Sequence, residues 1–160
     1  MVLELSDYVI GAVLLIIAVI DARRFEIPDR LSFTVIGLAA IQLYFIERDL
    51  SMDRLMGGVT AFLLFELTRR IMAFRLKRDA LGMGDVKLMM GGGLWVGLSY
   101  LPFSILLACL TGLLHFLYLA VFYKTSLREQ KIPFGPYLVL GLTSVKLPFI
   151  QNILSTLAPF

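Results

Sequence analysis

The sequence predicts an all-α integral membrane protein, one membrane-embedded domain over residues 1–160 built as a bundle of about six transmembrane helices. Hydrophobic residues make up 59% of the chain, charged residues only 17%, and the mean hydropathy is +0.86. Soluble domains average about 45–50% apolar and 25% charged residues, and a soluble core of this size could not bury so many apolar side chains. We therefore expect a lipid bilayer to cover much of the surface.

Six apolar stretches of helical length follow one another along the chain. They cover residues 3–20, 31–46, 55–65, 86–101, 103–123 and 135–150, and a weaker seventh covers 153–160. A full span needs about 20 residues, so the shorter stretches must recruit loop residues or lie where the bilayer thins. The leader of the first stretch carries Glu4 and Asp7 but no Lys or Arg, and no small-x-small cleavage site follows that stretch. We therefore expect a retained span rather than a signal peptide.

The basic residues are concentrated in alternate connections between the predicted spans. Twelve of the fifteen Lys and Arg residues lie within residues 21–30, 66–87 and 124–133. The positive-inside rule places these three connections in the cytoplasm and both termini outside it, with the protein in the cell (inner) membrane. The net charge of +3 then reports membrane orientation, and we expect no nucleic-acid partner.

Asp21 ends the first predicted span and is the first candidate for chemistry. An acid at a helix C-terminus meets the negative end of the macrodipole, where a cation would be preferred. Ile27 and Pro28 then favour an extended segment that stops the helix. An interfacial charge that only marks the helix end is the alternative interpretation, because such residues avoid only the bilayer interior.

A second acid, Asp85, follows two glycines, Gly82 and Gly84, at the start of the fourth span. Neither a GxGxxG nor a GxxxxGK[ST] pattern is present, so the glycines do not indicate a nucleotide-binding loop. The glycines permit backbone conformations or close approaches that a side chain would prevent. The later glycines, at positions 91–93 and 97, favour helix packing, but packing does not explain the acid.

Asp21 and Asp85 lie on the same predicted face of the membrane, each at the mouth of a span. If the helices bring them together, one carboxyl stays protonated and the other acts as a base. Such a pair can hydrolyse a peptide without a metal, and the single cysteine, Cys109, excludes a disulfide or a CxxC metal site. We expect no cofactor. Because a helix N-terminus favours the Asp85 anion, we expect Asp21 to hold the proton.

Three further features are polar or conformationally restricted. The run Pro133, Phe134, Gly135 and Pro136 makes a stiff start to the sixth span, with Pro136 in the first helical turn. Taken alone, this run is simply a helix start. His115 is expected to form a hydrogen bond between helices, and Glu66 is expected to pair with Arg69 or Arg70 at helical spacing.

Taken together and in this order, the motifs resemble those of the prepilin peptidases, a family of GxGD membrane aspartic proteases. The resemblance covers nearly the whole chain. Presenilin-like proteases share the GxGD motif, but they are longer and carry a Pro-Ala-Leu motif that is not found here. The matching residues are Asp21, Ile27, Pro28, Asp29, Gly82, Gly84, Asp85, Lys87, Leu88, Pro133, Phe134, Gly135 and Pro136.

The resemblance implies a specific reaction at the cytoplasmic face of the membrane. Family members remove a short basic leader from type IV prepilins and pseudopilins, and Asp21 and Asp85 match their two catalytic aspartates. Gly82 and Gly84 match the motif glycines, which would fit the backbone close to the catalytic acid or the substrate. Lys87 would pair with a nearby acid or anchor the interface. The resemblance sets no oligomeric state.

Many bacterial members also carry an N-terminal insertion with CxxC pairs and N-methylate the new terminus with S-adenosylmethionine. We expect the short form of the family here, a peptidase without methyltransferase activity and without zinc. Two alternatives stay open at this point: a presenilin-like protease that cuts within substrate helices, and a non-enzymatic membrane scaffold or transporter subunit in which the acids pair with Arg23 or Arg24 or relay protons.

Overall fold

The computed structural model describes residues 2–45, 51–77, 81–123, 133–147 and 150, and within these residues it is all-helical, with six helices and no strand. This confirms the predicted all-α class. The six helices, in chain order, are α1 (Val2–Arg24), α2 (Asp29–Phe45), α3 (Ser51–Leu76), α4 (Met83–Val96), α5 (Leu101–Tyr123) and α6 (Gly135–Ser144). The weak seventh stretch, residues 153–160, lies outside the described residues.

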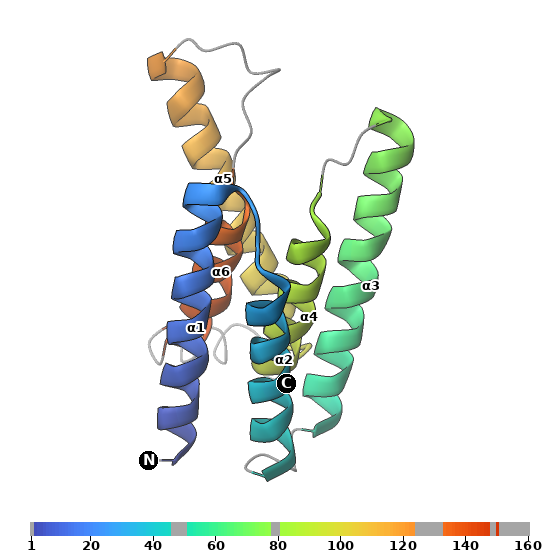
Figure 1. Cartoon of the computed structure of the whole chain (residues 1–160), viewed down its shortest axis with the longest axis vertical. Helices are drawn as coiled ribbons and strands as arrows, with labels where there is room; N and C mark the ends of the chain where they lie inside the picture. The colour runs from blue at the N-terminus through green and yellow to red at the C-terminus, as the bar shows by residue number, and fades with distance from the viewer. Residues whose placement is uncertain (1, 46–50, 78–80, 124–132, 148–149, 151–160) are drawn as a thin grey trace.

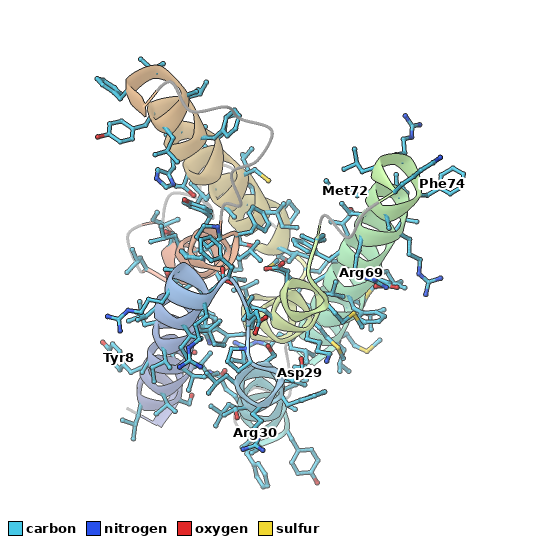
Figure 2. The ribbon with its side chains drawn as sticks, turned by 45° about the horizontal axis from the view of Figure 1, so that its top comes forward. Tyr8, Asp29, Arg30, Arg69, Met72 and Phe74 are labelled. Carbon is cyan, nitrogen blue, oxygen red and sulfur yellow. The ribbon has the colours of Figure 1, made fainter. Side chains whose placement is uncertain are left out.

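The prediction for the third helix was wrong at its C-terminal end. The apolar stretch was expected to stop at residue 65, but α3 continues to Leu76, so Arg69 and Arg70 lie on the helix rather than in a loop. Along this extension Glu66 pairs with both arginines at helical spacing, with N···O distances of 2.8 and 2.7 Å, and such pairs favour the helix. Figure 2 shows Arg69, Met72 and Phe74 along this extension.

Two of the described helices are long and apolar enough to cross a membrane, at Leu5–Arg24 in α1 and Leu101–Phe122 in α5. Many large apolar side chains on the other helices are nevertheless exposed, including Phe33 on α2 and Leu63 and Leu67 on α3. The arrangement of six transmembrane spans stays a prediction.

The helices alternate in direction (Figure 1). The C-terminal ends of α1, α3 and α5 and the N-terminal ends of α2, α4 and α6 point toward the top of that view. These are the helix ends that flank the three connections rich in Lys and Arg. α4 packs against α2, α3 and α6, and α6 packs against α1 and α5.

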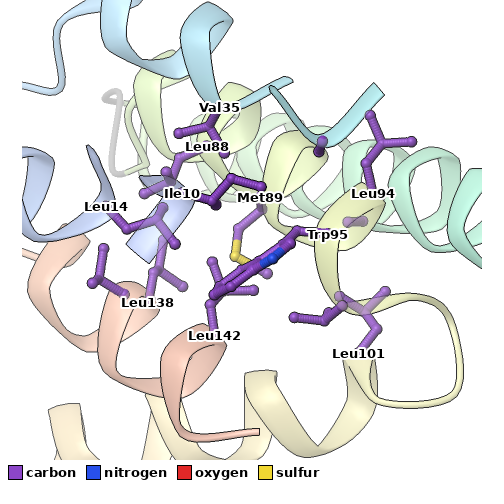
Figure 3. Close-up of a cluster of buried hydrophobic side chains, with 14 of the residues drawn as sticks. Ile10, Leu14, Val35, Leu88, Met89, Leu94, Trp95, Leu101, Leu138 and Leu142 are labelled. Carbon is purple, nitrogen blue, oxygen red and sulfur yellow. The ribbon is translucent and has the colours of Figure 1, made fainter. Parts of the chain in front are cut away.

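The core of the bundle gathers around α4, whose residues from Leu88 onward are almost all buried. Figure 3 shows Met89 and Trp95 of α4 among apolar side chains of α1 and α6. Close packing of these buried apolar side chains stabilises the contacts of α4 with its neighbours. The side chains that surround α4 include Ile10, Leu14, Val35, Leu138 and Leu142.

Glycines set the approach of α4 to its neighbours. A Cβ atom on Gly57 of α3 would lie 2.5 Å from the carbonyl oxygen of Gly93, so the two backbones touch. On other sides of α4, Gly91 lies against Val35 and Gly92 against Leu142. This confirms the expected packing role of the glycine cluster. Gly97, with φ of 83°, ends α4 in a conformation that side chains rarely adopt.

A polar cluster joins the helices at the end opposite to the basic connections. The carboxylate of Asp7 on α1 accepts hydrogen bonds from Gln42 Nε2 of α2 at 2.8 Å and from Trp95 Nε1 of α4 at 2.7 Å. Lys146, after α6, places its Nζ 3.9 Å from the same carboxylate oxygen. One carboxylate thus ties α1, α2 and α4 together.

The glycine contacts generate a stability prediction. Gly93→Val would force a branched side chain into the backbone of Gly57, and overpacking of this kind costs about 1–3 kcal/mol. We expect a lower melting temperature in detergent micelles. Gly37→Ala is the matched control, because nothing lies within 4 Å of an added Cβ there and alanine is favoured over glycine inside a helix. Equal melting temperatures for Gly93→Val and the unsubstituted protein would contradict the packing role.

Candidate active site

Asp21 lies in the last turn of α1 rather than at its final residue, since the helix continues to Arg24. Phe25, with φ of 56°, ends the helix, and its N–H donates to the carbonyl oxygen of Asp21 at 2.8 Å. Residues 26–28 are non-helical, and α2 begins at Asp29, directly after Pro28. The predicted break between the two helices is observed here, but α1 already ends at Arg24, and Pro28 directly precedes α2 rather than stopping α1.

The carboxylate of Asp21 is held by the first turn of α6. The backbone N–H of Gly135 donates to Asp21 Oδ2 at 2.8 Å, and Asp21 is only 5% exposed. A Cβ on Gly135 would lie 2.7 Å from the same oxygen, so this contact requires glycine. Pro136 lies in the first turn of α6, as expected. A merely interfacial charge does not fit a buried carboxylate bound to a second helix.

This contact removes the argument that Asp21 holds the proton. The C-terminal end of α1 by itself disfavours the Asp21 anion, but the carboxylate also accepts an N–H at the N-terminus of α6. A helix N-terminus favours an anion. Asp21 therefore lies at the C-terminal end of α1 and beside the N-terminus of α6, so the end of α1 alone does not decide which acid holds the proton.

Asp85 is the third residue of α4, and Gly82 is the N-cap residue of that helix. The Gly82 backbone hydrogen-bonds to the Asp85 carboxylate, which keeps that carboxylate over the start of the helix. This is the arrangement of the second half of a capping box, in which an acid or amide at the third helical position reaches back to the N-cap N–H. The GxGD spacing therefore fixes the rotamer of Asp85.

Gly84 connects the two motifs that carry the acids. A Cβ on Gly84 would lie 2.8 Å from Ile27 Cβ and 3.2 Å from the Ile27 carbonyl oxygen. The segment of Ile27 and Pro28 thus packs directly on the first turn of α4. This is the close approach that the sequence pattern predicted for the motif glycines.

Lys87 pairs with Asp29, which confirms the expectation that it has an acidic partner. The Nζ···Oδ2 distance is 2.7 Å, and the Lys87 ammonium also lies 5.3 Å from the centroid of the Phe33 ring. Asp29 opens α2 and Lys87 lies in the second turn of α4. The ion pair therefore joins the beginnings of α2 and α4 beside Asp85.

The two acids influence each other electrostatically. Burial and then the nearby charge of Asp21 raise the pKa of Asp85 to about 6, while the hydrogen bond from Gly82 acts in the opposite direction. Asp85 precedes the apolar stretch that begins at Val86 and lies outside the two apolar spans. Two carboxylates close enough to interact are expected to titrate as a pair.

The predictions for Glu66 and His115 are both confirmed. Glu66 pairs with Arg69 and with Arg70, as expected. The His115 imidazole contacts the Tyr137 hydroxyl between α5 and α6, which confirms its helix-packing role. In the described part of the chain, no group of three or more His, Cys, Asp and Glu side chains is arranged to hold a metal ion.

Sequence reasoning missed the partner of Asp21. Pro133 and Phe134 precede α6, as expected of a helix start, but the contact of Gly135 with Asp21 was not predicted. A backbone donor leaves no side-chain signal. The sequence does contain one indication, the glycine directly before Pro136. A turn restricted by proline does not itself require glycine there, so the glycine indicates that another atom approaches the backbone closely.

Comparison with known proteins identifies the family. The model of the type IV leader peptidase family matches residues 8–117, which include both aspartates and the GxGD motif. The chain belongs to the type IV leader peptidase family. The matched region ends before α6, so the contact of Gly135 with Asp21 comes from the structure alone. No solved structure matches the chain significantly.

Curated relatives carry leader-peptidase names. The chain is 33% identical over 138 residues to the type 4 prepilin-like proteins leader peptide-processing enzyme of Escherichia coli, which covers 86% of this chain and 49% of that protein. It is 30% identical over 133 residues to the prepilin leader peptidase/N-methyltransferase of Legionella pneumophila, covering 81% and 45%. The chain therefore spans about half the length of these family relatives.

The raised pKa of Asp85 generates a stability prediction that needs no substrate. In the unfolded chain an aspartate has a pKa near 3.9, whereas the pKa of Asp85 in the folded protein is about 6. Between about pH 4 and pH 6 the Asp85 carboxyl is therefore ionised in the unfolded state but still protonated in the folded state. The free energy of unfolding accordingly falls as the pH rises through this range. Asp85→Asn removes this cost. We expect the variant to melt a few degrees above the unsubstituted protein at pH 8, with the difference vanishing at pH 4.

The matched control for this titration is Glu26→Gln, which changes an exposed carboxylate in the connection between α1 and α2. Because this side chain is exposed, its substitution should change the melting temperature little. A melting difference for Asp85→Asn that is the same at pH 4 and pH 8 would rule out the raised pKa as its cause.

Proposed function

We propose that this protein is a membrane aspartic endopeptidase that removes the leader from type IV prepilins or pseudopilins. One observation carries the proposal: Asp21 and Asp85, from two different helices, lie close enough to interact electrostatically, and each carboxylate accepts a backbone hydrogen bond. The family and the names of the relatives support prepilin-like proteins as the substrate class.

In the proposed reaction the pair shares one proton. The ionised carboxylate takes a proton from water as the water oxygen attacks the carbonyl carbon of the scissile peptide. The protonated carboxyl donates a hydrogen bond to the carbonyl oxygen and stabilises the charge that develops there. The tetrahedral intermediate then collapses, the C–N bond breaks, and the leaving nitrogen accepts a proton from the pair.

The neighbouring motif residues act on the geometry of this pair. Gly84 and Ile27 set the spacing between the connection of α1 to α2 and the first turn of α4. The ion pair of Lys87 with Asp29 holds the starts of α2 and α4 together. A misplacement of about 1 Å can cost 10²-fold in rate, so we assign these residues to positioning rather than to proton transfer.

We propose that the chain crosses the inner membrane six times, with Asp85 at the mouth of the fourth span, and that the site opens to the cytoplasm, with both termini on the other side. The exposed apolar side chains of α1, α3 and α5 support contact with lipid. The Lys and Arg residues that flank the upper helix ends of Figure 1 support the cytoplasmic location of the site.

Substitution of either aspartate tests the catalytic assignment. Asp21→Asn and Asp85→Asn should each lower cleavage of a co-expressed, tagged type IV prepilin by roughly 10²–10⁴-fold, because each removes one member of the acid–base pair. Glu26→Gln should cleave normally. Immunoblots of the membrane fraction would report both the cleaved prepilin and the amount of each variant.

The product distinguishes the alternatives. Mass spectrometry should place the new N-terminus between the leader and the hydrophobic helix of the prepilin, whereas a cut inside that helix would indicate a presenilin-like protease. Full cleavage by both single variants would contradict the aspartate mechanism. No cleavage of any prepilin would favour the scaffold or transporter interpretation, and an N-methylated product formed by the purified protein would contradict the expected absence of methyltransferase activity.

The membrane orientation is testable by labelling. In a Cys109→Ser background, Glu26→Cys should react with a membrane-impermeant maleimide only in inside-out vesicles, because it lies in the connection predicted to face the cytoplasm. Leu5→Cys, at the other end of α1, should react only in right-side-out vesicles. The reverse pattern would invert the orientation and place the aspartates outside the cytoplasm.

A further inference from the structure

His115 on α5 contacts Tyr137 on α6, and Tyr137 is close to the turn that holds Asp21. His115 is the single histidine of the chain and belongs to the long apolar span of α5. Its Nδ1 contacts the hydroxyl of Tyr137, and the two rings are tilted by 48° with centroids 5.7 Å apart. In an apolar span, breaking such a contact would leave two polar groups without water as a substitute.

Tyr137 belongs to the turn that holds Asp21. Its backbone N–H donates to the carbonyl oxygen of Phe134 at 3.1 Å, so Phe134 and Tyr137 bracket Gly135 and Pro136 in one closed turn. The ring of Tyr137 is buried, with 9% of the residue exposed. The proline restricts φ within the turn. A displacement of Tyr137 would therefore carry the Gly135 N–H with it.

The tolerance for such a displacement is small. The Gly135 N–H lies 2.8 Å from Asp21 Oδ2, and the backbone is so close that an added Cβ would overlap the carboxylate. On the α5 side, an added Cβ on Gly112, one turn before His115, would lie 3.5 Å from the Tyr137 ring. The turn is thus enclosed between α5 and the last turn of α1.

We propose that His115 and Tyr137 are positioning residues, which hold the Gly135 N–H on the Asp21 carboxylate through the first turn of α6. The proposal rests on the peptidase function proposed above. Neither side chain touches the aspartates, so neither is a catalytic residue. The pair acts on the orientation of Asp21 and on its preference for the ionised form.

Kinetics on the purified full chain in lipid nanodiscs, with a tagged type IV prepilin as substrate, test the proposal. Tyr137→Phe and His115→Leu should each lower kcat by roughly tenfold with KM within about twofold, because the substrate is bound but the carboxylate is less well oriented. Each should also shift the pH profile of kcat. The double variant should be no worse than the single ones, and His115→Gln, which keeps a polar partner for the hydroxyl, should restore most of the activity.

A second measurement does not depend on activity. In protein labelled with ¹⁵N-glycine, the Gly135 amide resonance is assigned by its loss in Gly135→Ala, and it should move in Asp21→Asn because the hydrogen bond to the carboxylate is lost. Tyr137→Phe should move the same resonance, whereas Tyr8→Phe, at an exposed tyrosine near the other end of α1, should not.

The outcomes separate the two proposals. An unsubstituted protein that cleaves no prepilin, or an Asp21→Asn variant that cleaves it fully, would overturn the peptidase function, and the positioning role for that reaction would fall with it. An active protein in which folded Tyr137→Phe and His115→Leu keep the normal kcat, pH profile and Gly135 resonance would overturn the positioning role alone. Equal melting temperatures identify the variants as folded.

Discussion

The close backbone approach of α4 to its neighbours is the constraint on which the remaining structure depends. Gly91, Gly92 and Gly93 give the middle of this helix no side chains, so α2, α6 and α3 each lie against bare backbone. α4 can therefore occupy the centre of the bundle although it has only 14 residues. Its central position places Asp85, at the start of the helix, near Asp21 of α1 and the connection from α1 to α2.

The two aspartates reach comparable environments by different routes. Asp85 is near the N-terminus of its own helix and hydrogen-bonds to the Gly82 backbone, a local interaction within four consecutive residues. Asp21 is near the C-terminus of its own helix and takes its backbone donor from Gly135, 114 residues away. Each glycine at the site marks a place where backbone and carboxylate, or backbone and side chain, come into contact.

The local features could be predicted from the sequence. Hydrophobic stretches located all six helices, Ile27 and Pro28 located the break between α1 and α2, and the charge distribution placed Asp21 and Asp85 at the same end of the bundle. The extension of α3 beyond residue 65 was missed because a hydropathy pattern counts Glu66, Arg69 and Arg70 as a break. The structure shows instead that Glu66 pairs with both arginines along the helix.

The long-range contacts could not be predicted in the same way. The Gly135 N–H is a backbone group, and its partner lies on a helix that only the tertiary packing brings near. The same holds for Asp7, which the sequence showed only as an acid in the leader of the first span and which the structure places against Gln42 and Trp95. A single sequence contains no spacing rule that joins positions so far apart.

The hydrogen bond of Asp7 with Trp95 has a mechanical consequence for the site at the opposite end. It joins α1 and α4, the two helices that carry the aspartates, although α1 packs mainly against α6 and α2. At a rise of about 1.5 Å per residue, this joint lies roughly 20 Å from Asp21 and roughly 15 Å from Asp85 along the helix axes. A tilt of about 5° at such a pivot would move the distant carboxylates by between about 1 and 2 Å. A shift of the Asp7–Trp95 contact would therefore change the separation of the two acids at the opposite end of the bundle.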